Sequence, residues 1–366
     1  MLAIYRKYRP KLLKEFFGQE QVIQVLQNAA KQDKFAHAYL FYGSRGSGKT
    51  TTARLLAKLA NCEGRQKTKT LHDKGEPCNK CRVCTEIDSG RALDIIEIDA
   101  ASNRGIDEIR NLKEGIKLSP SSFKYKVFII DETHMLTKEA FNALLKTLEE
   151  PPAHAIIILA TTEYEKVPAT ISSRTQRFHF RRLHLSEILG KLNHIVQSEK
   201  IKITDEALEL IAALAEGSLR DAESLLDQIN SLDQNIELQD VEKIAGKIGY
   251  RKIFQLSDFI LKKDLSGALK YLNEIDQEGY NLVQLNKELI HYLRRALTLK
   301  LSSQIEEIYA KELTKDELIH LRQHAGLGTE ALLVQLLKAL IRAYSEMRYS
   351  PFAIVPLEVA LIEQLQ

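Results

Sequence analysis

The stretch from residue 38 to residue 50, AYLFYGSRGSGKT, carries the strongest evidence about the fold. Its first five residues form an apolar run typical of a buried strand. Residues 43–50 then give a glycine, four residues, a second glycine, a lysine and a threonine. Such glycines let backbone N–H groups turn inward around phosphate, and a following helix adds positive potential. We therefore expect a phosphate loop between a strand and a helix, with Lys49 on the β- and γ-phosphates and Thr50 on Mg²⁺.

Further apolar runs follow at residues 95–98, 127–130 and 156–159. Their nearly continuous apolar character is typical of parallel strands buried on both faces. Between the last two runs, residues 138–150 place apolar side chains at helical spacing, and a pair of prolines then ends the helix. After residue 183 apolar residues recur only at helical spacing. The sequence thus predicts an α/β parallel sheet followed by an all-α region.

Two adjacent carboxylates, Asp131 and Glu132, follow the run at 127–130. Ligands of open α/β sheets bind at the carboxyl ends of the strands, so both should lie near the phosphate loop. We expect Asp131 to hold Mg²⁺ and Glu132 to polarise the water that attacks the γ-phosphate. Thr162, at the end of the next strand, is expected to hold that water or the γ-phosphate.

Two arginines differ from ordinary surface charge. Arg220 falls in the first turn of a helix that begins after Gly217, where the helix dipole disfavours a cation unless an anion binds there. Arg174 stands where the α/β region ends, in a basic cluster that extends to Arg182. From the residues alone, this cluster is compatible with a solvated face or a nucleic-acid patch as well as with catalysis.

All four cysteines lie in one stretch: fifteen residues separate Cys62 from Cys78, and two-residue gaps lead on to Cys81 and Cys84. Four thiolates with such gaps suit tetrahedral zinc, and an iron–sulfur cluster is the alternative. With four protein ligands, zinc would be structural and would fold the polar loop 63–90. We expect loss of this metal to leave the core folded and turnover largely intact, and we expect His72 to be a solvated loop histidine.

Composition narrows the class of protein. A length of 366 residues predicts two or three domains, and 44% hydrophobic with 28% charged residues exclude disordered and fibrous chains. The net charge of +3 is too small for a general nucleic-acid or membrane-surface binder, so any basic site must be local. No apolar run is long enough to span a bilayer and no signal peptide is apparent, so we expect a cytoplasmic protein.

Short stretches besides the phosphate loop carry a family resemblance: Tyr8-Arg9-Pro10, Gly18-Gln19-Glu20, 37–41, 98–102, 141–152, 160–162 and 216–222. With these the chain resembles the AAA+ ATPases, and among them the tau/gamma clamp-loader subunits of bacterial DNA polymerase III. The resemblance implies a RecA-like core over residues 1–182 with a zinc module at about 62–84. It also implies a helical lid over 183–247 and a helical collar over 248–366.

The same resemblance implies function. It predicts an ATP-hydrolysing subunit that opens a sliding clamp and loads it onto primer–template DNA, within a heteropentamer of delta-like and delta-prime-like subunits and further copies of itself. Thr162 would be sensor 1, Arg220 sensor 2, and Arg174 the arginine finger acting on the neighbour's ATP. Thr175 follows that arginine where the family has cysteine.

Residue-by-residue correspondence extends the expected sites. The ATP-binding residues would be Tyr8, Arg9, Pro10, Gly43, Ser44, Arg45, Gly46, Ser47, Gly48, Lys49, Thr50, Thr51 and Arg220. Contacts to the DNA backbone would come from Arg104, Arg110 and Lys146. Such phosphate contacts read shape without base specificity.

Two other functions stay open at this stage. One is a different AAA+ motor, such as a branch-migration helicase, which the cysteine insertion and the all-helical ending disfavour. The other is a scaffold that holds ATP only as a structural ligand, which the intact Lys49, Asp131, Glu132 and Arg220 disfavour.

Overall fold

The computed structural model describes residues 3–102, 112, 114–232, 235–245, 250–310 and 313–365. The chain forms two compact units. The first runs to Leu183 and also includes Gly217–Asp221, and the second contains His184–Glu216 and the residues from Ala222 onward. Within the described ranges, none of the helices combines the length and the apolar character that a membrane crossing requires.

A five-stranded parallel sheet forms the centre of the first unit. Its strands, in spatial order, are β2 (Ile95–Asp99), β3 (Lys126–Asp131), β4 (Ala155–Thr161), β1 (Ala38–Gly43) and β5 (Gln176–Phe180). In the register, Ile158 of β4 lies beside both Tyr39 of β1 and Ile129 of β3. The four expected strands and the parallel α/β fold are therefore confirmed.

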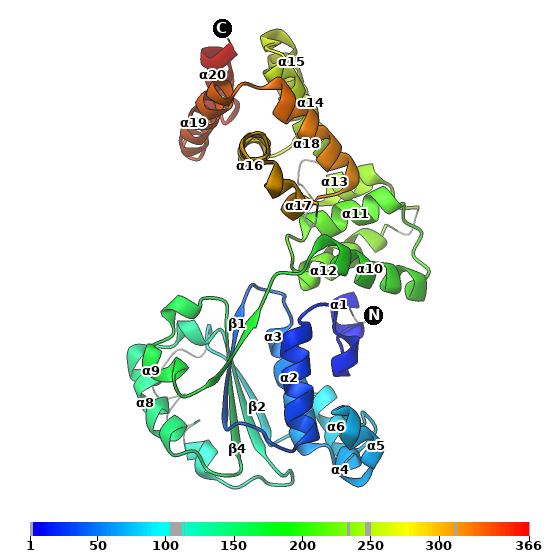
Figure 1. The fold of residues 1–366 in the computed structure, drawn as a ribbon, viewed down its shortest axis with the longest axis vertical. Helices are drawn as coiled ribbons and strands as arrows, with labels where there is room; N and C mark the ends of the chain where they lie inside the picture. The colour runs from blue at the N-terminus through cyan, green and yellow to red at the C-terminus, as the bar shows by residue number, and fades with distance from the viewer. Residues whose placement is uncertain are drawn as a thin grey trace. The chain divides into compact units, whose positions relative to one another are not determined.

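Helices cover both faces of this sheet (Figure 1). On one face, α2 (Glu20–Lys31) and α3 (Lys49–Asn61) share a core with Tyr39 and Phe41. On the other face, α8 (Lys138–Glu149) and α9 (Ala169–Ser172) pack against the intervening residues, such as Leu40. Because neighbouring residues of a strand point to opposite faces, this arrangement buries β1 on both sides and explains its unbroken apolar sequence.

The edge strand β5 was missed by the sequence analysis. Only Phe178 and Phe180 are buried there, while Arg177 and His179 are exposed. An edge strand needs one buried face only, so its alternating polar residues did not form the apolar run that identified the other strands.

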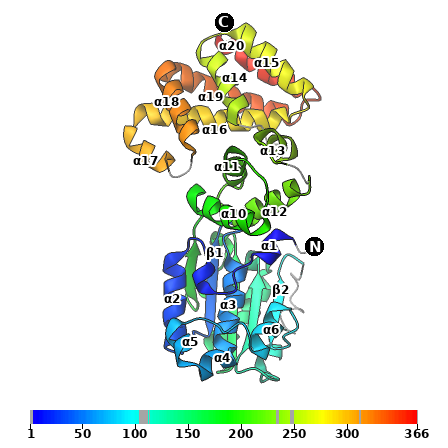
Figure 2. The same ribbon diagram turned by 90° about the vertical axis from the view of Figure 1, so that its right-hand side faces the viewer.

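Short elements complete the first unit. They are α1 (Ile4–Lys7), η1 (Leu13–Glu15), α4 (Glu63–Lys67), α5 (Lys69–Lys74), α6 (Arg82–Asp88), η2 (Thr133–Met135) and η3 (Tyr164–Lys166). Figure 2 shows α4, α5 and α6 gathered in one region, which contains the four cysteines and is called the cysteine module below. The stretch 63–90 was expected to be a polar loop, but three helices lie within it. The backbone N–H and C=O groups of this polar stretch form hydrogen bonds within these short helices.

The second unit is helical throughout its described residues, apart from one isolated bridge between Ile203 and Ile236. The helices are α10 (Leu185–Glu199), α11 (Asp205–Leu214), α12 (Leu219–Asn230), α13 (Leu238–Ala245), α14 (Tyr250–Leu261), α15 (Leu265–Gln277), α16 (Leu282–Leu301), η4 (Ser303–Ile305), α17 (Glu306–Tyr309), α18 (Lys315–Leu327), α19 (Glu330–Met347) and α20 (Ile354–Leu365). The first three residues of α12 belong to the first unit. Helix α16 buries Leu285, Leu289 and Leu293 along one face. The expected change from an α/β to an all-α region is confirmed.

Candidate nucleotide site and metal centre

The phosphate loop joins β1 directly to α3. A Cβ atom added at Gly43, where φ is +141°, would lie 2.0 Å from the carbonyl oxygen of Phe180. At Gly46, where φ is +71°, it would lie 2.0 Å from Ser218 Oγ. The loop therefore runs so close to its neighbours that both positions require glycine.

Lys49 points back into this loop. Its Nζ donates hydrogen bonds to the carbonyl oxygens of Gly43 (2.9 Å) and Ser44 (2.8 Å). Burial lowers the pKa of Lys49, and the nearby Glu132 and Asp131 partly oppose this shift. The hydroxyl of Ser44 is buried without a hydrogen-bond partner among the described residues. A buried ammonium and an unpaired hydroxyl in one glycine loop fit a bound phosphate group.

Thr50 and Asp131 meet beside the loop, although they are far apart in the sequence. Thr50 Oγ1, in the first turn of α3, donates to Asp131 Oδ2 at 2.7 Å. Asp131 Oδ1 accepts the backbone N–H of Glu132 at 2.9 Å. A hydroxyl and a carboxylate are oxygen ligands of the kind that Mg²⁺ takes, so this pair fits a cation that accompanies the phosphates.

Glu132 occupies a strained position at the end of β3. Its φ of +47° lies in the left-handed region that a non-glycine residue seldom adopts, and such strain concentrates at functional sites. Thr162 Oγ1 donates to Glu132 Oε2 at 3.0 Å. Thr133 Oγ1 donates to the carbonyls of Ile130 (2.8 Å) and Ala160 (3.0 Å), which joins the ends of β3 and β4. The structure thus brings together the carboxylate and the hydroxyl that the sequence placed on neighbouring strands.

His134 is a member of this group to which the sequence analysis gave no role. Its Nδ1 lies 3.0 Å from Thr161 Oγ1 and 3.4 Å from Glu132 Oε2, and its Nε2 lies 3.2 Å from Glu163 Oε1. The side chain is 7% exposed. The one available signal was its place two residues after Glu132, where the short helix η2 turns the ring back toward the carboxylate.

The N-terminal segment lies against the phosphate loop. Tyr8, Arg9 and Pro10 fall between α1 and η1, and all three are partly buried. A Cβ atom added at Gly48 would lie 2.9 Å from the Phe16 ring. The amide of Gln19, also without an assigned role, donates to the carbonyls of Arg181 (2.8 Å) and Ser47 (3.4 Å). Side chains from residues 16–19 therefore fix this segment beside the loop.

Arg220 belongs to the same unit as the phosphate loop. Its guanidinium carbon lies 5.2 Å from the centre of the Tyr5 ring, a cation–π distance. The backbone N–H of Asp221 donates to Ser218 Oγ at 3.3 Å, and Ser218 is the residue that approaches Gly46. The start of α12 is thus held beside the loop.

Two other expected ATP-binding residues lie at the loop itself. Arg45 is exposed there, and Thr51 is partly buried on α3.

Arg174 is held elsewhere, on the face that carries α8 and α9. Its Nε and Nη2 lie 3.1 and 2.8 Å from Glu149 Oε1, and its Nη1 donates to the Thr170 carbonyl at 2.9 Å. Lys146 is exposed on α8. Arg104 and Arg110, the other two expected DNA contacts, lie outside the described residues.

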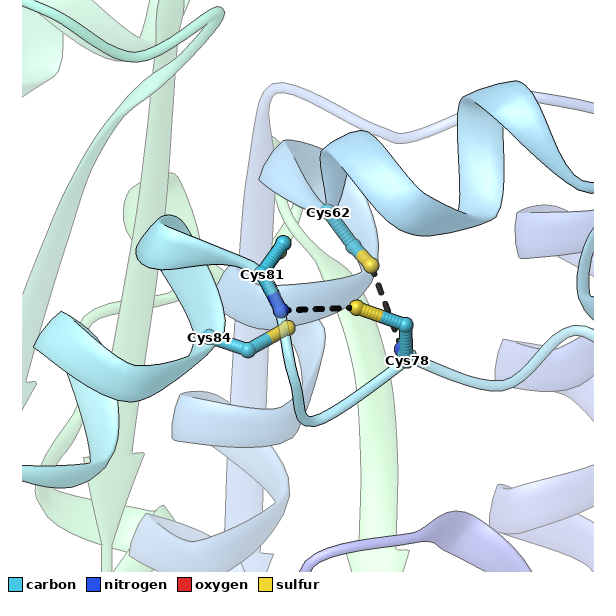
Figure 3. A group of neighbouring side chains, drawn as sticks. All are labelled: Cys62, Cys78, Cys81 and Cys84. Atoms are coloured by element: carbon cyan, nitrogen blue, oxygen red, sulfur yellow. Dashed lines mark hydrogen bonds between the residues drawn. The ribbon is translucent and has the colours of Figure 1, made fainter.

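The four cysteines form a closed group at the C-terminal end of α3 (Figure 3). Their sulfur atoms all lie within 4.8 Å of one another. Backbone N–H groups of Arg65 (3.3 Å) and Cys78 (3.2 Å) donate to Cys62 Sγ. Those of Lys80 (3.4 Å) and Cys81 (3.2 Å) donate to Cys78 Sγ. N–H groups directed at sulfur stabilise thiolates, so the donor set fits a metal ion with four sulfur ligands.

Hydrogen bonds within the cluster shift the thiol pKa values in opposite directions. A hydrogen bond from Cys84, together with the backbone N–H groups, lowers the pKa of Cys62 to about 5. The pKa of Cys84 is raised, first by that same hydrogen bond and then by burial and the neighbouring sulfur charge. Four thiolates this close repel one another, and a divalent cation offsets that repulsion.

The cysteine module is anchored by a fully buried arginine. Arg65 donates to the carbonyls of Leu59 in α3 (3.0 Å) and Ala30 in α2 (2.7 Å), and it pairs with Asp33 at 2.5 Å. His72 also reaches Asp33, with Nε2 2.9 Å from Oδ2. The expectation of a solvated His72 is therefore wrong: the ring is 31% exposed and hydrogen-bonded to Asp33, because α5 packs against α2.

Comparisons with known proteins agree along the whole length. Residues 18–184 match the family described as DNA polymerase III, delta subunit. Residues 187–230 match the DNA polymerase III clamp loader subunit, ATPase lid domain. Residues 236–365 match DNA polymerase III subunits gamma and tau domain III. These matches follow one another in a single chain.

Individual relatives fall in two length classes. The chain is 42% identical to Bacillus subtilis DNA polymerase III subunit tau over 365 residues, which is 100% of this chain and 63% of that protein. It is 38% identical to Mycoplasma genitalium DNA polymerase III subunit gamma/tau, covering 94% of this chain and 59% of that protein. It is 36% identical to the DNA polymerase III subunit gamma of Buchnera aphidicola subsp. Schizaphis graminum, covering 98% of this chain and 97% of that protein. The chain belongs to the gamma/tau subunit family of bacterial DNA polymerase III.

Proposed function

We propose that this chain is an ATP-hydrolysing clamp-loader subunit, which opens a sliding clamp and loads it onto primed DNA during replication. The observation that carries the proposal is the meeting of Lys49, the Thr50–Asp131 pair and the Thr162–Glu132 pair at one edge of the sheet. Phosphoryl transfer requires positioning and charge neutralisation above all, and these groups supply both.

Each group has a role in this proposal. Lys49 binds the β- and γ-phosphates, Thr50 and Asp131 hold Mg²⁺, and Glu132 orients the attacking water. Thr162, which shares a hydrogen bond with Glu132, responds to the γ-phosphate as sensor 1. Arg220 approaches the same nucleotide as sensor 2.

Family membership also supports a proposal for the domains of this chain and its partners in a ring. We infer a core over 1–182, a lid over 183–247 and a collar over 248–366, and separate family matches at 187–230 and 236–365 support this division. The ring partners would be delta-like and delta-prime-like subunits and further copies of this chain, together with the clamp and primer–template DNA. In the ring, Arg174 would leave Glu149 and reach the neighbour's ATP, and Lys146 with Arg104 and Arg110 would face the DNA backbone.

Zinc is the proposed ion of the cysteine module. Four sulfurs and no open position suit a structural zinc ion rather than a catalytic one. Elemental analysis of freshly purified, reduced protein distinguishes zinc from the iron–sulfur alternative.

The decisive test is ATP hydrolysis by this chain alone, with its cognate ring subunits, and with clamp and primed DNA added. We expect turnover that rises with clamp and DNA, and we expect Lys49→Ala to lose ATP binding because the phosphates lose their buried ammonium. An exposed lysine, Lys34→Ala, serves as the matched control. Clamp-independent turnover would favour another AAA+ motor, and binding without turnover in any mixture would favour a scaffold.

A further inference from the structure

The cysteine module makes direct contact with the backbone of the N-terminal segment. Glu76, two residues before Cys78, is 5% exposed. Its Oε2 accepts the backbone N–H of Leu13 at 2.8 Å, and its Oε1 accepts that of Lys14 at 2.9 Å. Oε1 also accepts the side-chain amide of Gln27 in α2 at 3.1 Å. One buried carboxylate therefore holds η1 and α2 together.

A second tie runs parallel to the first. The amide of Asn79, the residue after Cys78, donates to the carbonyl of Lys11 at 3.0 Å. Lys58 Nζ, on α3, donates to Asn79 Oδ1 at 3.1 Å. Gly75 also approaches α2, because a Cβ atom there would lie 2.6 Å from the Gln27 carbonyl oxygen. The residues on either side of Cys78 thus hold residues 11–14.

Residues on both sides of the segment 11–14 lie at the phosphate loop or are proposed to bind its nucleotide. Before it come Tyr8, Arg9 and Pro10, the proposed ATP-binding residues. After it come Phe16, which contacts Gly48, and Gln19, which donates to the Ser47 carbonyl. Any displacement of residues 11–14 would shift both groups relative to the loop.

We propose that the cysteine module positions residues 8–16 against the phosphate loop, and that Glu76 is the positioning residue that connects metal binding to nucleotide binding. The inference rests on the proposed function, since it concerns the same nucleotide. It also changes the expectation drawn from the sequence: loss of the metal leaves the sheet folded but weakens ATP binding.

Binding of a fluorescent ATP analogue with Mg²⁺ tests the proposal. Glu76→Gln replaces one acceptor oxygen with an N–H₂ group that faces a backbone N–H, so we expect affinity to fall about tenfold. Asp73→Asn is the matched control, because Asp73 is an exposed acid of the same module, and it should bind as the wild type does. Hydrogen exchange at Leu13 and Lys14 should accelerate only in Glu76→Gln.

Metal removal provides the second arm. Wild type and Glu76→Gln are stripped under reducing conditions, the chelator is removed, and binding is measured again with Mg²⁺ present. If the metal acts through Glu76, stripping should weaken wild-type binding about tenfold but add little to the variant, a non-additivity expected of coupled groups.

The outcomes separate the two proposals. Failure of the metal-loaded wild type to bind the analogue would contradict the proposed function. Wild-type affinity in a metal-loaded Glu76→Gln protein, or in stripped wild type, would overturn the positioning role while leaving the nucleotide site in place. If Glu76→Gln itself loses the metal, the stripped wild type alone decides.

Discussion

The two ends of helix α3 carry sites of different kinds. At its N-terminal end, Lys49 and Thr50 face loop carbonyls and a carboxylate, while the hydroxyl of Ser44 has no hydrogen-bond partner in the part of the chain that the structure describes. At its C-terminal end, the four sulfurs lie within 4.8 Å of one another, and backbone N–H groups donate to Cys62 Sγ and Cys78 Sγ. The helix has 13 residues, so at ~1.5 Å per residue the two ends are about 20 Å apart.

This contrast distinguishes an open site from a closed one. A group that still lacks a partner is available to substrate, whereas a group with all its ligands supplied by the chain serves the structure. Substitutions at the N-terminal end of α3 should therefore change the rate of ATP hydrolysis. Substitutions at its C-terminal end should change the metal content and the position of the N-terminal segment. Four predictions test this contrast.

The largest effect should come from Arg174, which tests whether the open end needs a group from another subunit. Arg174→Ala should keep nucleotide binding. Its ring-stimulated rate of ATP hydrolysis should fall by a factor of about 10³–10⁵, the range for arginine fingers supplied in trans. Arg177→Ala, a nearby exposed arginine, is the control. The measurement is clamp-dependent ATPase as Arg174→Ala subunits are titrated into wild-type loader. A decline merely proportional to the mutant fraction would show that Arg174 does not act on a neighbour.

Glu132→Gln should separate binding from chemistry. Glutamine keeps the shape and loses the carboxylate that orients water, so we expect a fall of about 10²–10⁴ in kcat. ATP and Mg²⁺ should bind as before. Single-turnover hydrolysis checks this, with the exposed Glu165→Gln as control. Comparable turnover in variant and wild type would remove Glu132 from the mechanism.

His134→Gln should have a smaller effect of the same kind. The ring lies between Thr161, Glu132 and Glu163, so its loss should let the Glu132 carboxylate rotate. We expect kcat to fall about tenfold, as for one lost hydrogen bond, with KM unchanged. The pH dependence of kcat is the second readout, because a merely structural role would leave its shape unaltered. A change confined to thermal stability would contradict the positioning role.

At the closed end the chemistry should change least. Wild-type protein should contain about one zinc per chain, and Cys81→Ser should lose it because tetrahedral binding needs all four thiolates. With saturating ATP, kcat should stay within about twofold, since the four cysteines lie at the opposite end of α3 from the phosphate loop. Elemental analysis and kinetics at high ATP test this. A large loss of kcat at saturation would erase the contrast between the two ends.

Local patterns predicted much of this molecule. Strands β1, β3 and β4 were found because burial on both faces leaves a continuous apolar run. Strand β2 lies at the other edge and is only partly buried, but its isoleucines still form an apolar run. Lys49, Asp131 and Glu132 were found because phosphate chemistry requires a fixed local spacing. Strand β5 escaped detection because exposed polar residues, such as Arg177, alternate with its buried phenylalanines and break the apolar run.

Long-range contacts explain most of what was missed. Glu76 reads as one acid in a polar stretch, and only its approach to the Leu13 backbone gives it a role. Arg65 likewise becomes a buried anchor only where the ends of α2 and α3 come together. Contacts between residues so far apart in the sequence leave no spacing pattern from which they could be predicted.

The sheet order has a consequence for biosynthesis. Strand β1 is made first but lies between β4 and β5, which are made last in the sheet, and Gly43 fits tightly against Phe180. Pairing between segments so distant in the sequence has a high entropic cost and forms slowly. The phosphate loop therefore reaches its final shape only after residue 180 has left the ribosome. Until then the nascent chain exposes the unpaired backbone edges and the apolar side chains of β1, which are features that favour aggregation and chaperone binding.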